Sequence, residues 1–330
     1  MVMLVIAFLS FHPYGVSDGA NAFNYKHSTP NGVERIVSKL KPMRTKAGGQ
    51  FKLLLPALIP VIALSIIPLL QGIYLGFTDY RLGAPIHFNG LENYRYMLTD
   101  RYFWQSFRIG FLWTLIVTLG QIVLGLGLAL LLNAKLSLNA FSRVLILVPW
   151  AMPPVIRGIM WKIMYEPDTG VINYLFINAG LIDHSINWLS SFEFAIPAII
   201  VVGIWGDLPK AAVFLLAGLQ SISKDLYEAA RLDGVGVWKE FRHITLPMLK
   251  PVLAATVSLT FMWNFNAFGL VWVLTQGGPG GLTRLPMLAA YEEGFRYGNV
   301  GYAAAIGNVM VVIISIILFA YLRIQLREKA

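Results

Sequence analysis

The sequence contains no cysteine in its 330 residues, which excludes disulfide bonds, thiol catalysis and thiolate metal sites. It also carries little charge, because 13% of its residues are charged while 57% are hydrophobic. It has no Gly-x-x-x-x-Gly-Lys-Ser/Thr phosphate loop, so it lacks that means of holding ATP. No catalytic triad can be argued, and the five histidines show no metal-ligand spacing. We therefore predict no catalytic residue, no metal site and no cofactor bound by this chain.

The hydrophobic residues are gathered in long runs, which indicates that a bilayer is the solvent for most of the chain. Each of six runs is close to the roughly 20 residues that cross a hydrocarbon core. The runs are Leu53–Phe77, Ile109–Leu132, Val144–Tyr165, Phe194–Leu219, Pro251–Leu274 and Tyr302–Leu322. We predict an all-α polytopic membrane protein with six transmembrane helices. The Pro149–Pro154 stretch either breaks the third helix, facing protein or a cavity, or only kinks it.

The distribution of basic residues predicts how these helices are oriented. With a cytoplasmic N-terminus, 17 Lys or Arg lie in the cytoplasmic segments and 6 lie in the loops on the opposite side. Cytoplasmic loops carry the excess of Lys and Arg, so both termini are predicted to be cytoplasmic. The net charge of +9 then needs no nucleic-acid partner, because the basic residues follow the loops and do not gather on one face.

Two domains are predicted. Residues 1–50 form an N-terminal extension that is partly disordered and becomes basic before the first span, and residues 51–330 form the transmembrane domain. The apolar stretch at residues 1–10 is too short to span a membrane, and no basic residue precedes it as in a secretory signal.

A polar interruption at residues 220–247 separates two of the apolar runs. Ser223 can cap a short helix with acidic residues near its start, where the helix dipole favours negative charge. Gly234 then supplies a break. Beyond it, a second amphipathic helix is predicted from apolar residues at helical spacing, namely Val237, Trp238, Phe241 and Ile244. Two prolines are predicted to end it, Pro247 and Pro251.

Seven residues of this interruption carry a family resemblance through their identity and spacing: Ile244 and the six predicted coupling residues, Glu228, Ala229, Ala230, Gly234, Leu246 and Pro247. They resemble the "EAA" loop of bacterial binding-protein-dependent ABC importer permeases. The resemblance implies that residues 220–247 are the coupling loop, which sits in a cleft of an ATPase subunit. It further implies that Glu228 pairs with a basic residue of the ATPase and that Gly234 sets the bend.

The same resemblance implies the partners of the chain. They are a second homologous permease subunit, an ATPase homodimer that holds ATP and Mg, and an extracytoplasmic solute-binding protein. The chain would then be a transport subunit and not an enzyme, located as a multi-pass protein in the bacterial cytoplasmic (inner) membrane. Transport would proceed by alternating access, driven by closure of the ATPase around the coupling loop.

Two further motifs are similar to the carbohydrate branch of these permeases, the one exemplified by the maltose and glycerol-phosphate importers. Gly90–Tyr94 precedes an aromatic stretch that we predict to be a helix along the outer interface, formed around Tyr102, Phe103, Trp104 and Phe107. Leu274–Pro279 is the second motif and closes a helix with glycines. The resemblance implies an oligosaccharide or related sugar as substrate. One alternative is an ABC permease for a non-sugar solute. A secondary transporter is the less favoured alternative, because the sequence shows no inverted repeat and no paired ion site.

The fourth span contains an acid and a base one helical turn apart, Asp207 and Lys210. Ionisable groups at this depth cost a few kcal/mol and usually face a cavity or each other. They either neutralise each other or line the translocation pathway. Maltose-type permeases place mostly neutral or aromatic sugar contacts in the corresponding stretch. The lysine departs from that pattern and raises the hypothesis of an anionic saccharide.

The fifth span interleaves aromatic and amide side chains, including Trp263, Asn264 and Asn266. Sugar sites use this mixture, because aromatic faces stack on C–H surfaces and amides bond to hydroxyls. The stretch is therefore either a sugar contact or, as aromatic stripes often are, part of the packing between helices. The run also resembles one that contacts substrate in the maltose-type permease. Because the two asparagines alternate, one of them is expected to reach the pathway. Asn308 in the sixth span follows small residues that fit a helix seam, and it is the last pathway candidate.

The segment between Glu166 and Glu193 contains four acidic residues and no Lys or Arg. It is either a surface that faces the solute-binding protein or an ordinary solvated loop.

Overall fold

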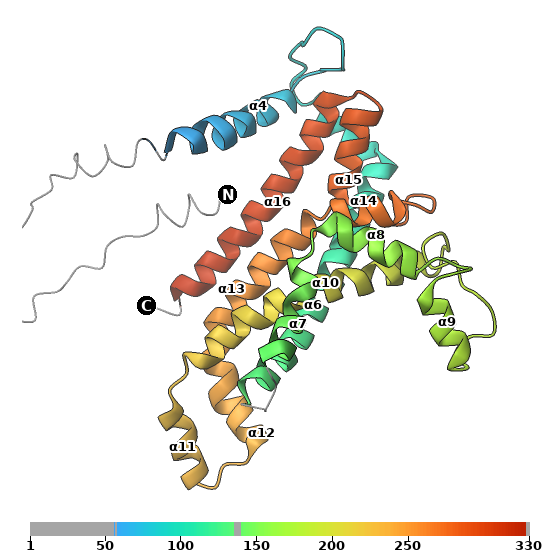
Figure 1. The fold of residues 1–330 in the computed structure, drawn as a ribbon. Helices are drawn as coiled ribbons and strands as arrows, with labels where there is room; N and C mark the ends of the chain where they lie inside the picture. Colours follow the sequence, from blue (N-terminus) through green and yellow to red (C-terminus); the bar gives the residue numbers. More distant parts are fainter. Residues whose placement is uncertain (1–55, 57, 135–139, 328–330) are drawn as a thin grey trace, which may run out of the picture. The chain divides into compact units, whose positions relative to one another are not determined.

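A computed structural model describes residues 56, 58–134 and 140–327 of the chain (Figure 1). The predicted N-terminal extension, residues 1–50, lies outside the described residues, as does the start of the predicted first span. The chain divides into two units, Met1–Gly72 and Ile73–Ala330. In the described ranges the structure is helical, and its one extended pairing is an antiparallel bridge between Thr78 and Phe88.

Helices follow one another through the described ranges, with three π-helical segments (η) among them. In order they are η1 (Ile62–Ile66), α4 (Ile67–Leu75), α5 (Glu92–Thr99), α6 (Arg101–Asn133), α7 (Ala140–Ala151), α8 (Pro154–Met164), α9 (Val171–Asn178), α10 (Ala195–Gln220), α11 (Lys224–Leu232), α12 (Val237–Glu240), η2 (Phe241–Thr245), α13 (Leu246–Phe265), α14 (Gly269–Thr275), α15 (Pro286–Tyr291), η3 (Glu292–Arg296) and α16 (Val300–Arg327).

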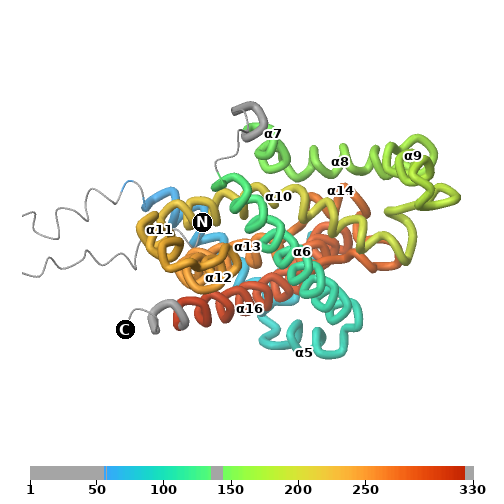
Figure 2. The backbone as a smooth tube through the Cα atoms, turned by 90° about the horizontal axis from the view of Figure 1, so that it is seen from below, coloured from blue at the N-terminus to red at the C-terminus, as the bar shows by residue number. Residues whose placement is uncertain are grey.

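Helices α6 and α10 are the centre of the second unit, and α13 packs against both of them (Figure 2). The buried face of α6 recurs every three or four residues, as an α-helix requires, through Ser106, Gly110, Trp113, Val117, Gln121, Gly125 and Ala129. Small residues bring the two helices close together. A Cβ added at Gly125 would lie 3.1 Å from the Cβ of Ala211, and one added at Gly203 would lie 2.6 Å from the ring of Trp113.

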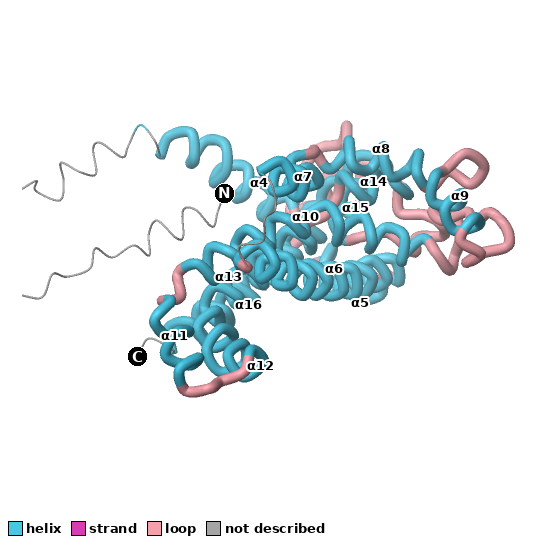
Figure 3. The backbone as a smooth tube through the Cα atoms, turned by 60° about the horizontal axis from the view of Figure 1, so that its bottom comes forward, coloured by secondary structure: helices cyan, strands magenta, loops and turns pink. Residues whose placement is uncertain are grey.

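The second unit has polar connections at its two opposite ends (Figures 1 and 3). One end carries the segment of α11 and α12. The other end carries α9 with the loops on either side of it and the turns around α14 and α15. The apolar helices α6, α10, α13 and α16 run between these ends, so the two polar regions are well separated.

Five described helical segments are long and apolar enough to cross a membrane, and α7 with α8 makes a sixth as a pair bent by 100°. The five are Leu58–Leu75, Arg101–Asn133, Ala195–Gln220, Val237–Phe265 and Val300–Arg323. The prediction of an all-α membrane protein with six apolar segments is therefore confirmed. The orientation of the termini stays a prediction.

The third predicted span is broken, not merely kinked. Helix α7 ends at Ala151 and α8 begins at Pro154, with the 100° bend between them. The prolines account for the break. Pro153 is in an extended conformation with ψ of 142°, and Pro154 takes the first helical position, where its missing N–H costs nothing.

The predicted fifth span, Pro251–Leu274, is wrong at both ends. The helix runs on from Val237 through Pro247 and Pro251 to Phe265, so these prolines do not end it. Before Pro247 the chain is π-helical, with the Leu246 N–H donating to the carbonyl of Phe241, and this wider turn gives the proline ring room. At its other end the helix stops at Phe265, and α14 is a separate short helix.

The predicted aromatic helix along the outer interface is also corrected. Tyr102, Phe103, Trp104 and Phe107 form the first turns of α6 itself, and the separate short helix is α5, which precedes them. Asp100 is the reason, because its side chain accepts a hydrogen bond of 2.8 Å from the Tyr102 N–H and starts the long helix there.

Candidate functional site

Helices α11 and α12 and the turn between them, residues 224–240, form a corner that is held by contacts to the helix after it and has an apolar tip. Ser223 caps α11 as predicted, accepting from the Asp225 N–H at 3.3 Å. Tyr227 Oη lies 3.2 Å from Thr245 Oγ1, and Arg231 Nε lies 3.6 Å from Glu240 Oε2, so both contacts join α11 to the helix that follows the turn. Three apolar side chains at the corner are exposed: Leu232 (89%), Val237 (83%) and Trp238 (70%). A corner that is braced inside and apolar outside can dock into a groove of another protein.

The structure brings four of the six predicted coupling residues together in this corner. Glu228 and Ala229 are exposed on α11, and Ala230 is buried beneath them. Gly234 has φ of +73°, the left-handed conformation in which glycine avoids the cost of a Cβ, and it ends α11 as predicted. Leu246 and Pro247 lie apart from the corner, in the first turn of α13. The coupling role of all six stays a prediction.

The predicted acid and base meet halfway along α10. Lys210 Nζ lies 3.4 Å from Asp207 Oδ1, and it also lies 3.9 Å from the ring centroid of Trp263 on α13. The lysine side chain is 13% exposed and that of Asp207 is 26% exposed, while Trp263 is 45% exposed. The structure therefore brings three of the six predicted pathway residues into one cluster, with Trp263 as its open side.

Arg157 on α8 completes this cluster, and sequence reasoning missed it. Its Nη2 lies 3.6 Å from Asp207 Oδ2, and its side chain is 5% exposed. Gly206 makes the room, because a Cβ there would lie 1.8 Å from Arg157 Nη1. Its position inside the predicted third span could have identified it, because an arginine inside an apolar span is rare and usually faces a partner or a cavity. The tertiary pairing with α10 could not be read from the spacing.

Asn264 lies inside the packing of α6, α10 and α13 and is 6% exposed. Its Nδ2 donates to Thr118 Oγ1 and to Gln121 Oε1, each at 3.0 Å, and Gln121 Nε2 donates to the Gly203 carbonyl at 2.8 Å. Trp113 Nε1 donates to the backbone carbonyl of the same asparagine at 3.1 Å. These bonds join three helices across their apolar surfaces, so the amide group of Asn264 is engaged in structure.

The two remaining pathway candidates also have partners in the chain. Asn266 is exposed at the end of α13, where its Nδ2 donates to the Met262 carbonyl at 2.9 Å. Asn308 on α16 donates to Tyr94 Oη at 2.8 Å and to the Ile73 carbonyl at 3.1 Å. Neither lies in the cluster around Asp207, and their role in transport stays a prediction.

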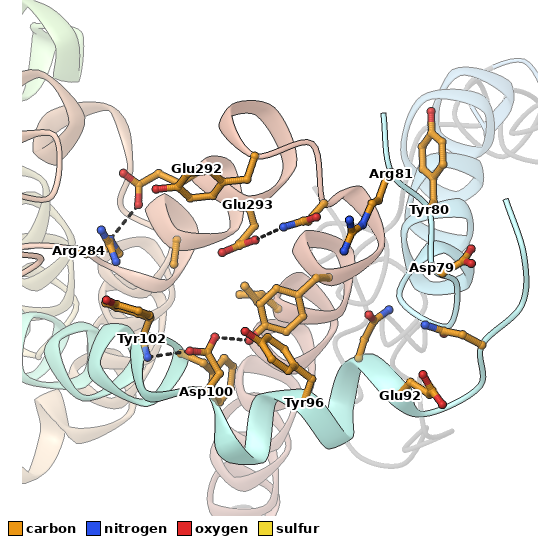
Figure 4. A pocket seen from close by; sticks show the side chains of 18 residues that line it. Asp79, Tyr80, Arg81, Glu92, Tyr96, Asp100, Tyr102, Arg284, Glu292 and Glu293 are labelled. Carbon is orange, nitrogen blue, oxygen red and sulfur yellow. Dashed lines mark hydrogen bonds and ion pairs between the residues drawn. The ribbon is translucent and has the colours of Figure 1, made fainter. Parts of the chain in front are cut away.

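A polar pocket of about 850 Å³ (Figure 4) lies at the end of the second unit opposite α11 and α12 (Figure 1). Asp100 lies within it and accepts hydrogen bonds from the Tyr302 hydroxyl and from the Tyr102 N–H, while Arg284 Nε lies 2.8 Å from Glu292 Oε2. Its other labelled side chains are Asp79, Tyr80, Arg81, Glu92, Tyr96 and Glu293. The Gly90–Tyr94 motif contributes Glu92 and Asn93 to the lining of the pocket. Asn93 is held in place there, because its Nδ2 donates to the carbonyls of Gly76 and Thr78 at 3.0 and 2.8 Å.

The acidic segment after α8 is held together by Asn173. Its side chain donates to the carbonyls of Pro167 and Ile186 at 3.1 and 2.9 Å and accepts from Trp188 Nε1 at 2.9 Å. The segment is therefore built around one buried amide, and its role toward a solute-binding protein stays a prediction. The described residues contain no group of three or more His, Cys, Asp or Glu that could hold a metal ion.

Comparison with known proteins gives consistent matches. The family model described as "Binding-protein-dependent transport system inner membrane component" matches residues 121–328. The trehalose/maltose transport system permease protein MalF of Thermococcus litoralis is 33% identical over 290 residues, which cover 88% of this chain and 97% of that protein. The sulfoquinovosyl glycerol transport system permease protein SmoG of Agrobacterium fabrum is 34% identical over 274 residues, covering 82% of this chain and 88% of that protein.

Among solved structures, the chain is similar to one from a bacterial ABC transporter involved in the import of the acidic polysaccharide alginate. The TM-score is 0.73 at 21% sequence identity, and the match covers 84% of this chain and 95% of the other. At this identity the match shows a shared fold.

Proposed function

Because the chain belongs to the family of inner membrane components of binding-protein-dependent transport systems, we propose that it moves a saccharide across the inner membrane as one permease subunit of an ABC importer. The substrate class is supported by the trehalose/maltose and sulfoquinovosyl glycerol permeases, which are over 30% identical to the chain across most of their length. The chain itself supplies the pathway and the coupling segment, and ATP hydrolysis belongs to partner ATPase subunits.

The observation that carries the proposal is the braced corner of α11 and α12. Its apolar tip would be costly in water and would be covered in a cleft of an ATPase subunit. Glu228 is exposed on α11 and would pair with a basic group of that subunit. The corner continues without a break into the helix Val237–Phe265, so closure of the ATPase around the corner would move that helix.

The other partners follow from the same reaction. A second, homologous permease would complete the pathway beside the exposed face of Trp263. An extracytoplasmic solute-binding protein would deliver the saccharide at the end opposite the corner, where the 850 Å³ pocket and the acidic segment lie. ATP and Mg would be held by the ATPase homodimer.

The test is uptake and ATP hydrolysis in proteoliposomes that hold the complete importer. Glu228→Ala removes a charged hydrogen-bonding group worth about 1.5–3 kcal/mol, so uptake and saccharide-stimulated hydrolysis should both fall by about tenfold or more. Arg108→Ala removes an exposed charge from α6, outside the corner, the pocket and the acidic segment, and is the control. Unchanged coupling in Glu228→Ala, or an importer that no saccharide stimulates, would contradict the proposal.

A further inference from the structure

The cluster around Asp207 carries an unbalanced charge in the middle of the membrane. Asp207 lies halfway along α10, a helix of 26 residues, and Arg157 and Lys210 both approach it. Two cations and one carboxylate leave a formal charge of +1 at a depth where uncompensated charge is expensive. Each carboxylate oxygen already faces one cation, since Oδ1 faces the lysine and Oδ2 faces the arginine.

Arg157 has hydrogen-bond donors without acceptors. Its guanidinium carries five N–H donors, and its contact with Asp207 at 3.6 Å is an ion pair longer than a hydrogen bond. Its Nε and Nη1 are buried and have no hydrogen-bond partner among the described residues. One helical turn further along α8, the buried Nε1 of Trp161 is also without a hydrogen-bond partner in the described part of the chain. Buried donors are nearly always paired, so this cluster lacks an acceptor.

The open side of the cluster is aromatic. Trp263 is 45% exposed, and Lys210 Nζ lies 3.9 Å from the centroid of its ring. Phe214 lies beside it, with ring centroids 6.3 Å apart and an interplanar angle of 29°. An exposed aromatic face next to cationic donors suits a sugar ring that bears an acidic group, because the ring stacks and the acid group pairs.

We propose that Arg157 and Lys210, held around Asp207, bind the carboxylate or sulfonate of an acidic saccharide while Trp263 stacks against its sugar ring. This rests on the proposed function and specifies its substrate class. The unpaired Nε–H and Nη1–H of the arginine each offer a charge-assisted hydrogen bond to such a group, and the lysine adds a point charge. Asp207 limits the net charge to +1, so the anion is attracted without being held so tightly that release is blocked. The alternative occupant is a carboxylate of the second permease.

The experiment measures binding of two size-matched probes to the purified complex of permeases and ATPases, without the solute-binding protein. The probes are a digalacturonide and the corresponding neutral digalactoside. We expect the acidic probe to bind wild type at least about tenfold more tightly than the neutral one, and Lys210→Gln to remove most of that difference. Arg157→Lys keeps the charge but loses the Nε and Nη1 donors, so it should weaken binding of the acidic probe alone. Lys162→Gln, a charge removed from the same helix α8 outside the cluster, should leave both affinities unchanged.

Four results would overturn the inference. They are failure of the acidic probe to bind, equal binding of both probes to wild type, an equal loss of both probes in Lys210→Gln, and weakened association of the two permeases in Lys210→Gln with the preference intact. The last result would assign the missing acceptor to the second permease. Uptake assays with the complete importer distinguish failure of this inference from failure of the proposed function. Uptake of neutral saccharides alone would support a saccharide importer and refute an acidic substrate.

Discussion

Replacing Gly206 by alanine tests whether the cluster on α10 is built around the arginine. The added Cβ would lie 1.8 Å from Arg157 Nη1 and 2.7 Å from its Cζ. To restore ordinary contact, the guanidinium must move away by about 1.6 Å. It is 5% exposed and cannot swing freely into open space. The substitution should therefore displace the arginine from Asp207 and cost about 1–3 kcal/mol, the usual range for overpacking.

A double-mutant cycle separates this effect from a general effect on the helix. Arg157→Ala removes the side chain that the new methyl group would meet, so Gly206→Ala should cost much less in that background. The assay is thermal unfolding of the purified complex in detergent, together with affinity for the acidic probe. Gly127→Ala on α6 is the control, because a Cβ there meets nothing within 4 Å among the described residues. If Gly206→Ala lowered stability equally with and without the arginine, the reasoning would be refuted.

Three further predictions address other parts of the chain. Gly234→Ala places a Cβ on a residue with φ of +73°, so it should cost about 1–2 kcal/mol and reduce coupled ATP hydrolysis, while Gly236→Ala, with φ of −73°, should not. Gln121→Leu removes an acceptor from its buried asparagine partner and should lower the free energy of unfolding by about 1–3 kcal/mol in a thermal melt, with much of the loss regained when both amides become leucine. The pKa of Asp79 is lowered from 3.8, first by the hydrogen bond from the His87 backbone N–H. The stabilisation that the ionised carboxylate gives should therefore be complete above pH 3.8 and be lost as the pH falls through the lowered pKa. The hydrogen-exchange protection factor of the His87 amide, taken against the intrinsic exchange rate at each pH, should then fall on acidification in wild type and stay low in Asp79→Asn.

Hydrophobic runs were enough to predict the membrane class and the number of apolar segments, because about 20 apolar residues have few other uses. Helix ends were less predictable. Pro247 and Pro251 are read as helix breakers from sequence, yet the π-helical turn before Pro247 lets the helix continue past it, and Pro251 lies inside α13. Asp100 starts α6 eight residues earlier than the apolar run suggests, because a capping side chain acts on backbone donors and not on hydropathy.

The candidate site was predictable where its residues are near in sequence. Asp207 and Lys210 are one turn apart, so their contact follows from helical geometry. Arg157 lies fifty residues earlier, and its approach to α10 depends on the break at Pro153 and Pro154. Asn264 shows the opposite limit. Its burial against Thr118 and Gln121 depends on tertiary packing, which local pattern does not contain, and its role as a sugar contact stays a prediction.

The unbroken helix from Val237 to Phe265 also has a mechanical consequence. Its 29 residues make a rod about 43 Å long, with the exposed corner at one end and the buried amide junction at the other. Pivoting at the junction, a tilt of only about 5° would carry the corner through about 4 Å. A small rotation of this helix at the junction therefore displaces the corner by several ångströms. Conversely, a displacement of the corner by an ATPase subunit would rotate the helix by a few degrees at the junction.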